Sequence, residues 1–199
     1  MSGNRWLQMI EENPGHSEWY IERFRSMAAA GDDLHGEARL IDAMAPRGAR
    51  ILDAGCGPGR VGGRLAELGH QVVGVDLDPT LIDAAREDHP GADWLVGDLA
   101  QLDLSAASLP HEFDIAVCAG NVMTFLDPTT RRDVLARIRD HLVDGGRLVA
   151  GFGADRGYGF DELFADAAAV GLREEVRLAT WDLRPLTSSS DFLVAVLAR

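Results

Sequence analysis

The stretch Ile51-Leu52-Asp53-Ala54-Gly55-Cys56-Gly57-Pro58-Gly59-Arg60 is the most informative part of the chain. Its apolar start predicts a short buried strand, and the segment RVGGRLAELG that follows predicts a helix, so the glycines form the turn between them. Glycine lets the backbone adopt positive φ and approach a ligand closely. Ligands of open α/β sheets bind at the carboxyl ends of the strands. The stretch therefore predicts a ligand-binding turn.

Two interpretations of this turn stay open from its residues alone. The segment 57–62 matches GxGxxG, the dinucleotide fingerprint, and Asp76 follows at about the expected distance. Counted from the strand end near Asp53, however, the first glycine is Gly55, and Arg60 stands where the third fingerprint glycine would fall. A carboxylate beside the turn disfavours an anionic pyrophosphate. S-adenosylmethionine has no phosphate and carries two cationic groups, so acidic side chains suit it better.

Acidic residues recur at the ends of three predicted strands. Asp76 ends QVVGVD, 23 residues after Asp53, and Asp98 ends ADWLVGD, 22 residues after Asp76. The carboxylate at the end of the second strand can accept two hydrogen bonds from the hydroxyls of a ribose. The carboxylate at the end of the third strand can accept one hydrogen bond from an adenine amine. Leu77 and Leu99 follow these acids and can form apolar walls for adenine. A single aspartate is often a turn or cap residue, but three in phase with strand ends favour a site.

Strands and helices alternate along the rest of the chain. Further strands are predicted at FDIAVCAG, RLVAGFG, VRLATWDLRP and DFLVAVLA, and helices at 79–87, 129–142 and 161–171. This alternation indicates βαβ units and a mostly parallel sheet covered on both faces. The last two strands are joined by too few residues for a crossover, so we expect them to be antiparallel.

The N-terminal part of the chain is expected to be helical. Helices are predicted at 16–30, with Ser17 as N-cap, and at 34–45, which Pro46 ends. We find no linker, repeat or low-complexity segment. Residues 1–199 are therefore expected to form one domain, in which residues 1–45 are a helical cap or lid.

Composition excludes several classes of function. The chain has 199 residues with a formal net charge of −13, and all 19 basic residues are arginine. Without lysine, neither a Schiff base nor a Walker phosphate loop can form. The acidic excess disfavours nucleic acid as a partner. The chain has only two cysteines, which favours a reducing, cytoplasmic compartment. It also has neither a signal-like apolar segment nor an apolar run of about 18 residues, so no membrane partner is expected.

Taken together, the motifs resemble those of class I S-adenosylmethionine-dependent methyltransferases, in particular small bacterial members with little beyond the core domain. ILDAGCGPG resembles the glycine motif, VVGVDLDP the acidic second-strand motif and WLVGDLAQLDL the third-strand motif. FDIAVCAGNVMTFL and HLVDGGRLVAGF resemble the fourth and fifth. The resemblance spans residues 34–199. It implies a Rossmann-like three-layer αβα sandwich with a seven-stranded sheet of order 3-2-1-4-5-7-6 and strand 7 antiparallel.

The resemblance also implies a cofactor, S-adenosyl-L-methionine, and a set of residues around it. The methionine part is expected at Asp53 and the glycine turn, the ribose at Asp76, and the adenine at Asp98 with its neighbouring leucine. The backbone after the fourth strand is expected to line the cofactor. The expected cofactor-binding residues are Asp53, Gly55, Cys56, Gly57, Asp76, Leu77, Asp98, Leu99, Ala119 and Gly120.

Catalytic residues are harder to predict, because methyl transfer depends mainly on alignment of the reactants. A general base is needed only for a protonated, weak nucleophile. His16 is a candidate base, Tyr20 or Arg25 could meet the methionine carboxylate, and Asn121 could orient the acceptor. Tyr20 could equally be a packing residue, His16 a surface residue and Asn121 a turn residue.

The acceptor is expected to be a small molecule. In the segment 155–160, Arg156 and Tyr158 could contact it, with ordinary loop structure as the alternative. The loop after the fourth strand lacks the N/D-P-P-Y pattern of methyltransferases that act on amino groups of nucleic-acid bases or glutamine. The histidines show no metal-ligand spacing, so no metal is expected. The alternatives are an RNA or protein methyltransferase, a NAD(P)-binding oxidoreductase, and a non-catalytic S-adenosylmethionine-binding module.

Overall fold

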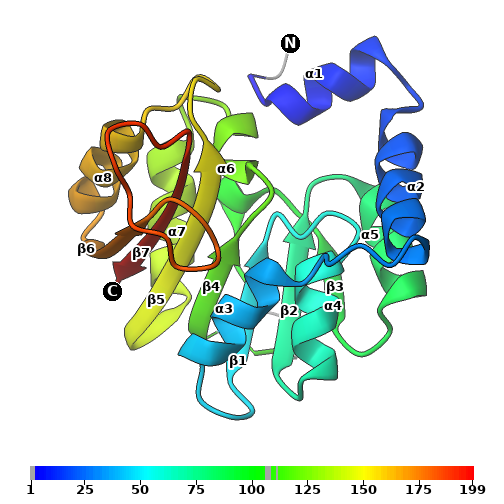
Figure 1. Ribbon diagram of the computed structural model, residues 1–199, viewed down its shortest axis with the longest axis horizontal. Coiled ribbons are helices and arrows are strands. Elements are labelled where there is room, and N and C mark those ends of the chain that lie inside the picture. Colours follow the sequence, from blue (N-terminus) through cyan, green and yellow to red (C-terminus); the bar gives the residue numbers. More distant parts are fainter. Residues whose placement is uncertain (1–2, 106–108, 111) are drawn as a thin grey trace.

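The computed structural model describes residues 3–105, 109–110 and 112–199. Its centre is a seven-stranded sheet whose strands are ordered β3-β2-β1-β4-β5-β7-β6 (Figure 1). All neighbours are parallel except β7, which is antiparallel to both β5 and β6. The predicted strand order and the antiparallel terminal pair are confirmed. The strands are β1 Arg50–Ala54, β2 Gln71–Asp76, β3 Asp93–Val96, β4 Phe113–Cys118, β5 Leu142–Gly153, β6 Arg173–Leu178 and β7 Phe192–Ala198.

Helices cover both faces of this sheet, because side chains of the central strands are apolar on both sides. In β1, Ile51 packs in a cluster with α3 and α4, whereas Leu52 packs in a cluster with α7 and α8 on the opposite face. Both side chains are fully buried. The helices are α1 Arg5–Glu12, α2 His16–Ala29, α3 Gly36–Met44, α4 Arg60–Glu67, α5 Pro79–Asp88, α6 Val122–Phe125, α7 Arg131–Asp140 and α8 Phe160–Ala169, with a 3₁₀ turn at Leu99–Gln101.

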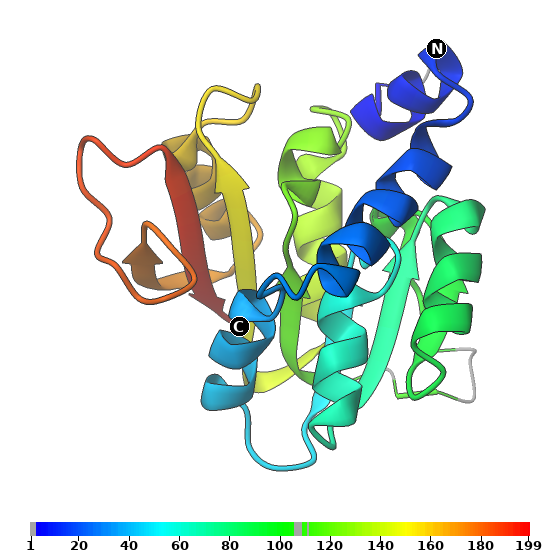
Figure 2. The same cartoon turned by 45° about the vertical axis from the view of Figure 1, so that its right-hand side comes forward.

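The N-terminal segment divides into two parts. Helix α3 packs through Ile41 into the cluster that covers the sheet beside α4. Helices α1 and α2 extend beyond that layer, and α2 runs beside α5 (Figures 1 and 2). Trp6 and Ile21 of these helices join a small apolar cluster with Leu81 and Ala84 of α5. Within the described part of this N-terminal segment, α1 and α2, and not α3, are therefore placed over the edge of the sheet where the strands end.

Several predicted boundaries are wrong. Helix α2 begins after Gly15, so Ser17 is not its N-cap; it is buried within the first turn, where its hydroxyl has another partner. The helix predicted at 129–142 ends at Asp140, and Leu142 already begins β5. Within the described part of the chain, no helix is long and apolar enough to cross a bilayer.

The predicted strand at 176–185 is displaced. Strand β6 begins three residues earlier, at Arg173, and ends at Leu178. The chain then turns back, with the N–H of Ala179 donating to the carbonyl of Arg184 over 2.7 Å. This turn lays Trp181 on β5, where a Cβ at Gly151 would come within 2.3 Å of the indole ring. Packing of the indole on β5 thus replaces continued strand pairing.

Candidate functional site

A pocket lies at the carboxyl ends of β1, β2, β3 and β4, beneath α1 and α2. It encloses about 860 Å³, including its opening to solvent. All ten residues expected around the cofactor line this one pocket. Residues from four separate strand ends therefore converge, as the phase of the aspartates predicts.

Asp53 is the most deeply buried acid of the pocket, with an exposed fraction of 2%. Its Oδ2 accepts a hydrogen bond from the N–H of Gly62 in α4 over 2.8 Å. Burial raises the pKa of the Asp53 carboxyl to about 7, because desolvation disfavours the charged form. An approaching cation would lower that pKa again and favour the carboxylate.

The glycine turn closes tightly over the strand ends. Gly55 has a φ of +79°, and a Cβ there would come within 2.5 Å of the Val122 side chain. The N–H of Gly57 donates to Oδ2 of Asp76 over 2.9 Å. Burial raises the pKa of the Cys56 thiol well above its usual range, so this side chain is a neutral filler and not a nucleophile.

Asp76 and Asp98 each have backbone partners as well as a place in the pocket. Oδ1 of Asp76 accepts from the N–H of Asp78 over 3.0 Å, and burial raises the pKa of the Asp76 carboxyl. Asp98 is the N-cap of the 3₁₀ turn, where its Oδ1 accepts from the N–H of Ala100 over 2.9 Å. Asp98 is thus both a cap and a pocket residue, so the two interpretations of its role are compatible.

Aromatic side chains from the N-terminal helices form the outer wall of the pocket. Trp6, Tyr20 and Phe24 line it, and the Tyr20 ring meets the Trp6 ring edge-on with centroids 5.2 Å apart. A Cβ at Gly120 would lie 4.0 Å from the Tyr20 hydroxyl. Burial raises the pKa of Tyr20, so its hydroxyl stays protonated and acts as a donor.

Arg60 lines the pocket, although the sequence motifs predicted no role for it. Among the described residues that line the pocket, it is the only basic one. Its guanidinium donates to both carboxylate oxygens of Glu37, over 2.9 and 2.6 Å, and to the carbonyl of Leu34 over 2.5 Å. Its position at the first residue of α4, directly after the glycines, was the signal that could have identified it.

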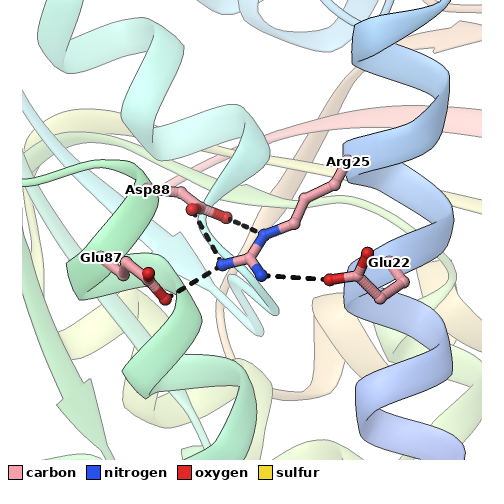
Figure 3. A network of polar contacts seen from close by, with 4 residues as sticks. All are labelled: Glu22, Arg25, Glu87 and Asp88. Atoms are coloured by element: carbon pink, nitrogen blue, oxygen red, sulfur yellow. Dashed lines mark hydrogen bonds and ion pairs between the residues drawn. The ribbon is translucent and has the colours of Figure 1, made fainter.

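Other candidates lie away from the pocket. His16 stacks on Trp19 and does not line it. Arg25 is wrong as a partner for the methionine carboxylate, because it does not line the pocket. Its guanidinium contacts three acids on the outer surface between α2 and α5 (Figure 3). Oδ1 of Asn121 accepts from the N–H of Gly153 over 2.8 Å, so this side chain joins the ends of β4 and β5.

Tyr158 does not line the pocket, so the structure does not support the first of its two possible roles, contact with the acceptor. Its side chain is buried against Phe152, and its hydroxyl donates to Asp166 over 2.8 Å. The apolar ring packs into the core, while Arg131 lies over its face with the guanidinium carbon 4.0 Å from the ring centroid. Across the described ranges, no three His, Cys, Asp or Glu side chains gather in a way that could hold a metal ion.

Comparison with known proteins establishes the family. A family model described as a methyltransferase domain matches residues 51–146. The solved structure of a TehB-like SAM-dependent methyltransferase from Corynebacterium glutamicum is 53% identical, with a TM-score of 0.89, and the match covers 94% of this chain and 100% of that one. This chain belongs to the S-adenosylmethionine-dependent methyltransferases.

Two curated relatives match the methyltransferase over part of their length. This chain is 30% identical over 144 residues to the ubiquinone biosynthesis O-methyltransferase of Xanthomonas euvesicatoria, and the match covers 64% of this chain and 58% of the relative. It is 34% identical over 87 residues to the 18S rRNA (guanine-N(7))-methyltransferase of Mus musculus, covering 44% of this chain and 30% of the relative. The chain thus spans little more than half of the first relative.

The pocket of the methyltransferase fits S-adenosylmethionine chemically. The cofactor carries a sulfonium, an ammonium and a carboxylate, and its ribose offers two hydroxyl donors. The pocket supplies three carboxylates, one guanidinium and a glycine turn where the backbone comes close. When bound, the cofactor supplies a methyl group activated by the sulfonium.

Proposed function

We propose that this pocket holds S-adenosylmethionine and that the methyltransferase transfers the methyl group to a small-molecule acceptor. The observation that carries the proposal is the convergence of Asp53, Asp76 and Asp98 on one pocket. Asp76 would accept the ribose hydroxyls, and Asp98 with Leu99 would hold the adenine. Asp53 would face the ammonium group, because a cation stabilises the ionised form of this buried acid.

Arg60 would bind the methionine carboxylate in place of Arg25. It lies beside the glycine turn, and its bidentate contact with Glu37 fixes the guanidinium in one orientation. The Tyr20 hydroxyl, which burial keeps protonated, is a neutral group that could donate in the same pocket. This arrangement gives the ammonium and the carboxylate of the methionine part each a partner of opposite charge.

The acceptor would lie against the aromatic wall. Trp6 and Phe24 of this wall, together with Phe125 of α6 beside it, present apolar surface to the pocket, which suits a small apolar or aromatic molecule. No described side chain of this wall is basic enough to remove a proton, since burial keeps Tyr20 protonated. An acceptor that is nucleophilic without a base, such as a neutral amine or a phenolate, therefore fits best.

A first experiment tests the ligand. Calorimetry is expected to show micromolar binding of S-adenosylhomocysteine and none of NAD or NADP. The variant Arg60→Gln is expected to weaken S-adenosylhomocysteine binding but not binding of 5′-methylthioadenosine, which lacks the carboxylate. Equal losses for both ligands would argue against the carboxylate role of Arg60, and binding of NAD alone would overturn the pocket assignment.

A second experiment tests the class of acceptor. Cell extract is separated into small-molecule, RNA and protein fractions, and each is incubated with the enzyme and radiolabelled S-adenosylmethionine. Label in the small-molecule fraction supports the proposal. Label in the RNA or protein fraction instead would replace it with the corresponding alternative. The Asp76→Ala variant serves as the control for enzyme-dependent transfer.

A further inference from the structure

Asp78 lies two residues after the proposed ribose acid, yet it does not line the pocket. Its side chain is buried, with an exposed fraction of 3%. One oxygen, Oδ1, caps α5 by accepting from the N–H of Thr80 over 2.9 Å. Its backbone N–H donates to Asp76 over 3.0 Å. Asp78 is therefore fixed to the pocket at one side and to α5 at the other.

The second oxygen of Asp78 holds both N-terminal helices. Oδ2 accepts from Nε1 of Trp6 in α1 over 3.0 Å and from the hydroxyl of Ser17 in α2 over 2.5 Å. Both donors come from sequence positions more than 60 residues away. Buried hydrogen bonds to a charged acceptor are stronger than those between neutral groups.

These contacts fix the outer wall of the pocket. Trp6 is both a donor to Asp78 and a pocket-lining residue. Its ring meets Tyr20 and Phe125, with centroids 5.2 and 5.8 Å away. Movement of Trp6 away from Asp78 would therefore remove one wall of the pocket and release a second aromatic side chain from its contact.

We propose that Asp78 is a positioning residue that latches α1 and α2 over the bound cofactor and so governs how long the cofactor stays. The proposal rests on the placement of S-adenosylmethionine in this pocket. Asp78 acts through Trp6 and Ser17, without touching the cofactor. Because Asp76 accepts from the Asp78 N–H, the latch adjoins the group that would hold the ribose.

A second contact between α2 and α5 provides a matched control. Arg25 donates to Asp88 over 2.9 Å and to Glu87 over 3.1 Å on the outer surface (Figure 3). Its side chain is 39% exposed, and Glu87 is 75% exposed. Exposed ion pairs contribute little. Arg25→Gln removes this contact and leaves the latch intact.

Three variants break the latch in different ways. Asp78→Asn keeps an oxygen to cap α5 but places an amide NH₂ against the indole N–H of Trp6, which can only donate. Ser17→Ala and Trp6→Phe each remove one donor and leave the cap of α5 unchanged. We expect each to raise the dissociation rate of S-adenosylhomocysteine by about ten-fold or more, and Arg25→Gln to change it by less than about two-fold.

Dissociation is measured by chasing bound radiolabelled S-adenosylhomocysteine with unlabelled ligand. Trypsin gives a second readout, because Arg5, Arg23 and Arg25 are cleavage sites in α1 and α2. In saturating ligand, Ser17→Ala is expected to be cut there faster than the wild type, because α2 has lost its hydrogen bond to Asp78. Cutting at the wild-type rate would contradict the latch.

Two outcomes of the dissociation measurement would also overturn the latch: unchanged dissociation in both Ser17→Ala and Asp78→Asn, or an equal rise in Arg25→Gln. A double variant of Trp6→Phe and Asp78→Asn is expected to dissociate no faster than Asp78→Asn alone, because both remove the same interaction. Failure of the pocket assignment looks different, since Asp76→Ala would then leave ligand affinity unchanged while the wild type still bound the ligand elsewhere.

Discussion

Asp76 combines two functions in one side chain. It accepts from the N–H groups of Gly57 and Asp78, and it faces the pocket. Asp76→Ala removes the proposed acceptor for the ribose hydroxyls and loosens the glycine turn. We expect S-adenosylhomocysteine to bind about 1.5–3 kcal/mol more weakly, as measured by calorimetry. Asp83→Ala, at an exposed acid of α5, is the control, and an unchanged affinity in Asp76→Ala would reject the ribose assignment.

Asp53 makes stability depend on pH. Its folded-state pKa of about 7 lies above the unfolded value of about 3.9, so the folded state binds more protons between these values. The free energy of unfolding therefore falls as pH rises from about 4 to 7. Asp53→Asn keeps an acceptor for the Gly62 N–H but cannot ionise. Denaturant titrations should show the wild type losing stability relative to Asp53→Asn across this window, and parallel pH profiles would contradict the burial argument.

The same carboxyl should couple cofactor binding to pH. If the ammonium group binds beside Asp53, it favours the ionised form, so binding releases a proton below about pH 7. The affinity for S-adenosylmethionine is then expected to rise as pH increases from about 5 to 7 and to level off above. Calorimetry in buffers of different ionisation enthalpy measures the released proton directly. Asp53→Asn should remove both effects.

Single residues also show where sequence reasoning succeeds and where it stops. The three aspartates were predictable because each lies at or just after the carboxyl end of an apolar strand, and parallel strands end at one edge of a sheet. The place of Arg60 directly after the glycines was a local signal for the pocket, but its pairing with Glu37, 23 positions away, left no pattern in the sequence. Arg25 was misplaced because nothing in the sequence shows that Glu87 and Asp88 come to lie beside it.

At the scale of elements, helix α4 approaches its neighbours through glycines. A Cβ at Gly63 would come within 2.4 Å of the His89 ring, near the ring's attachment to the backbone. Gly63→Ala is therefore expected to lower the free energy of unfolding by about 1–3 kcal/mol, because the overpacked ring cannot move freely. Gly36→Ala in α3 is the control, since its nearest neighbour is an arginine tip 3.8 Å away. Urea denaturation distinguishes the two, and equal stabilities would contradict the packing.

Element order was easier to predict than element ends. Alternating strands and helices predicted a mostly parallel sheet, and the short connection near the C-terminus predicted the antiparallel pair. The order of the strands in the sheet was implied by the resemblance to the family. The ends of β5 and β6 depended on tertiary contacts. Leu142 pairs with Phe113 of β4 although the helical pattern includes it, and Trp181 leaves the strand direction to cover Gly151. Such long-range packing leaves no periodic signal in the local sequence.

At the scale of the whole molecule, the acidic residues divide into a few at the pocket and many on the surface. The net charge of −13 first served to disfavour nucleic acid. Asp53, Asp76 and Asp98 now have places in the pocket, and Asp78 joins the pocket to the N-terminal helices. Many of the other acids pair with arginines on the surface, where such pairs contribute little to stability.

The pocket also joins parts of the chain that are otherwise packed separately. Its walls come from four strand ends and from α1 and α2, which contact the body through a small cluster of their own. A ligand that binds there only in the folded state stabilises the whole protein, by about 2.7 kcal/mol at 100 times its dissociation constant. For a chain of this size that raises the melting temperature by about 5–10 °C. S-adenosylhomocysteine is expected to produce this shift in a thermal melt, and NAD at the same concentration is expected to produce none. A shift with NAD alone would instead support the interpretation of the glycine turn as a dinucleotide-binding motif.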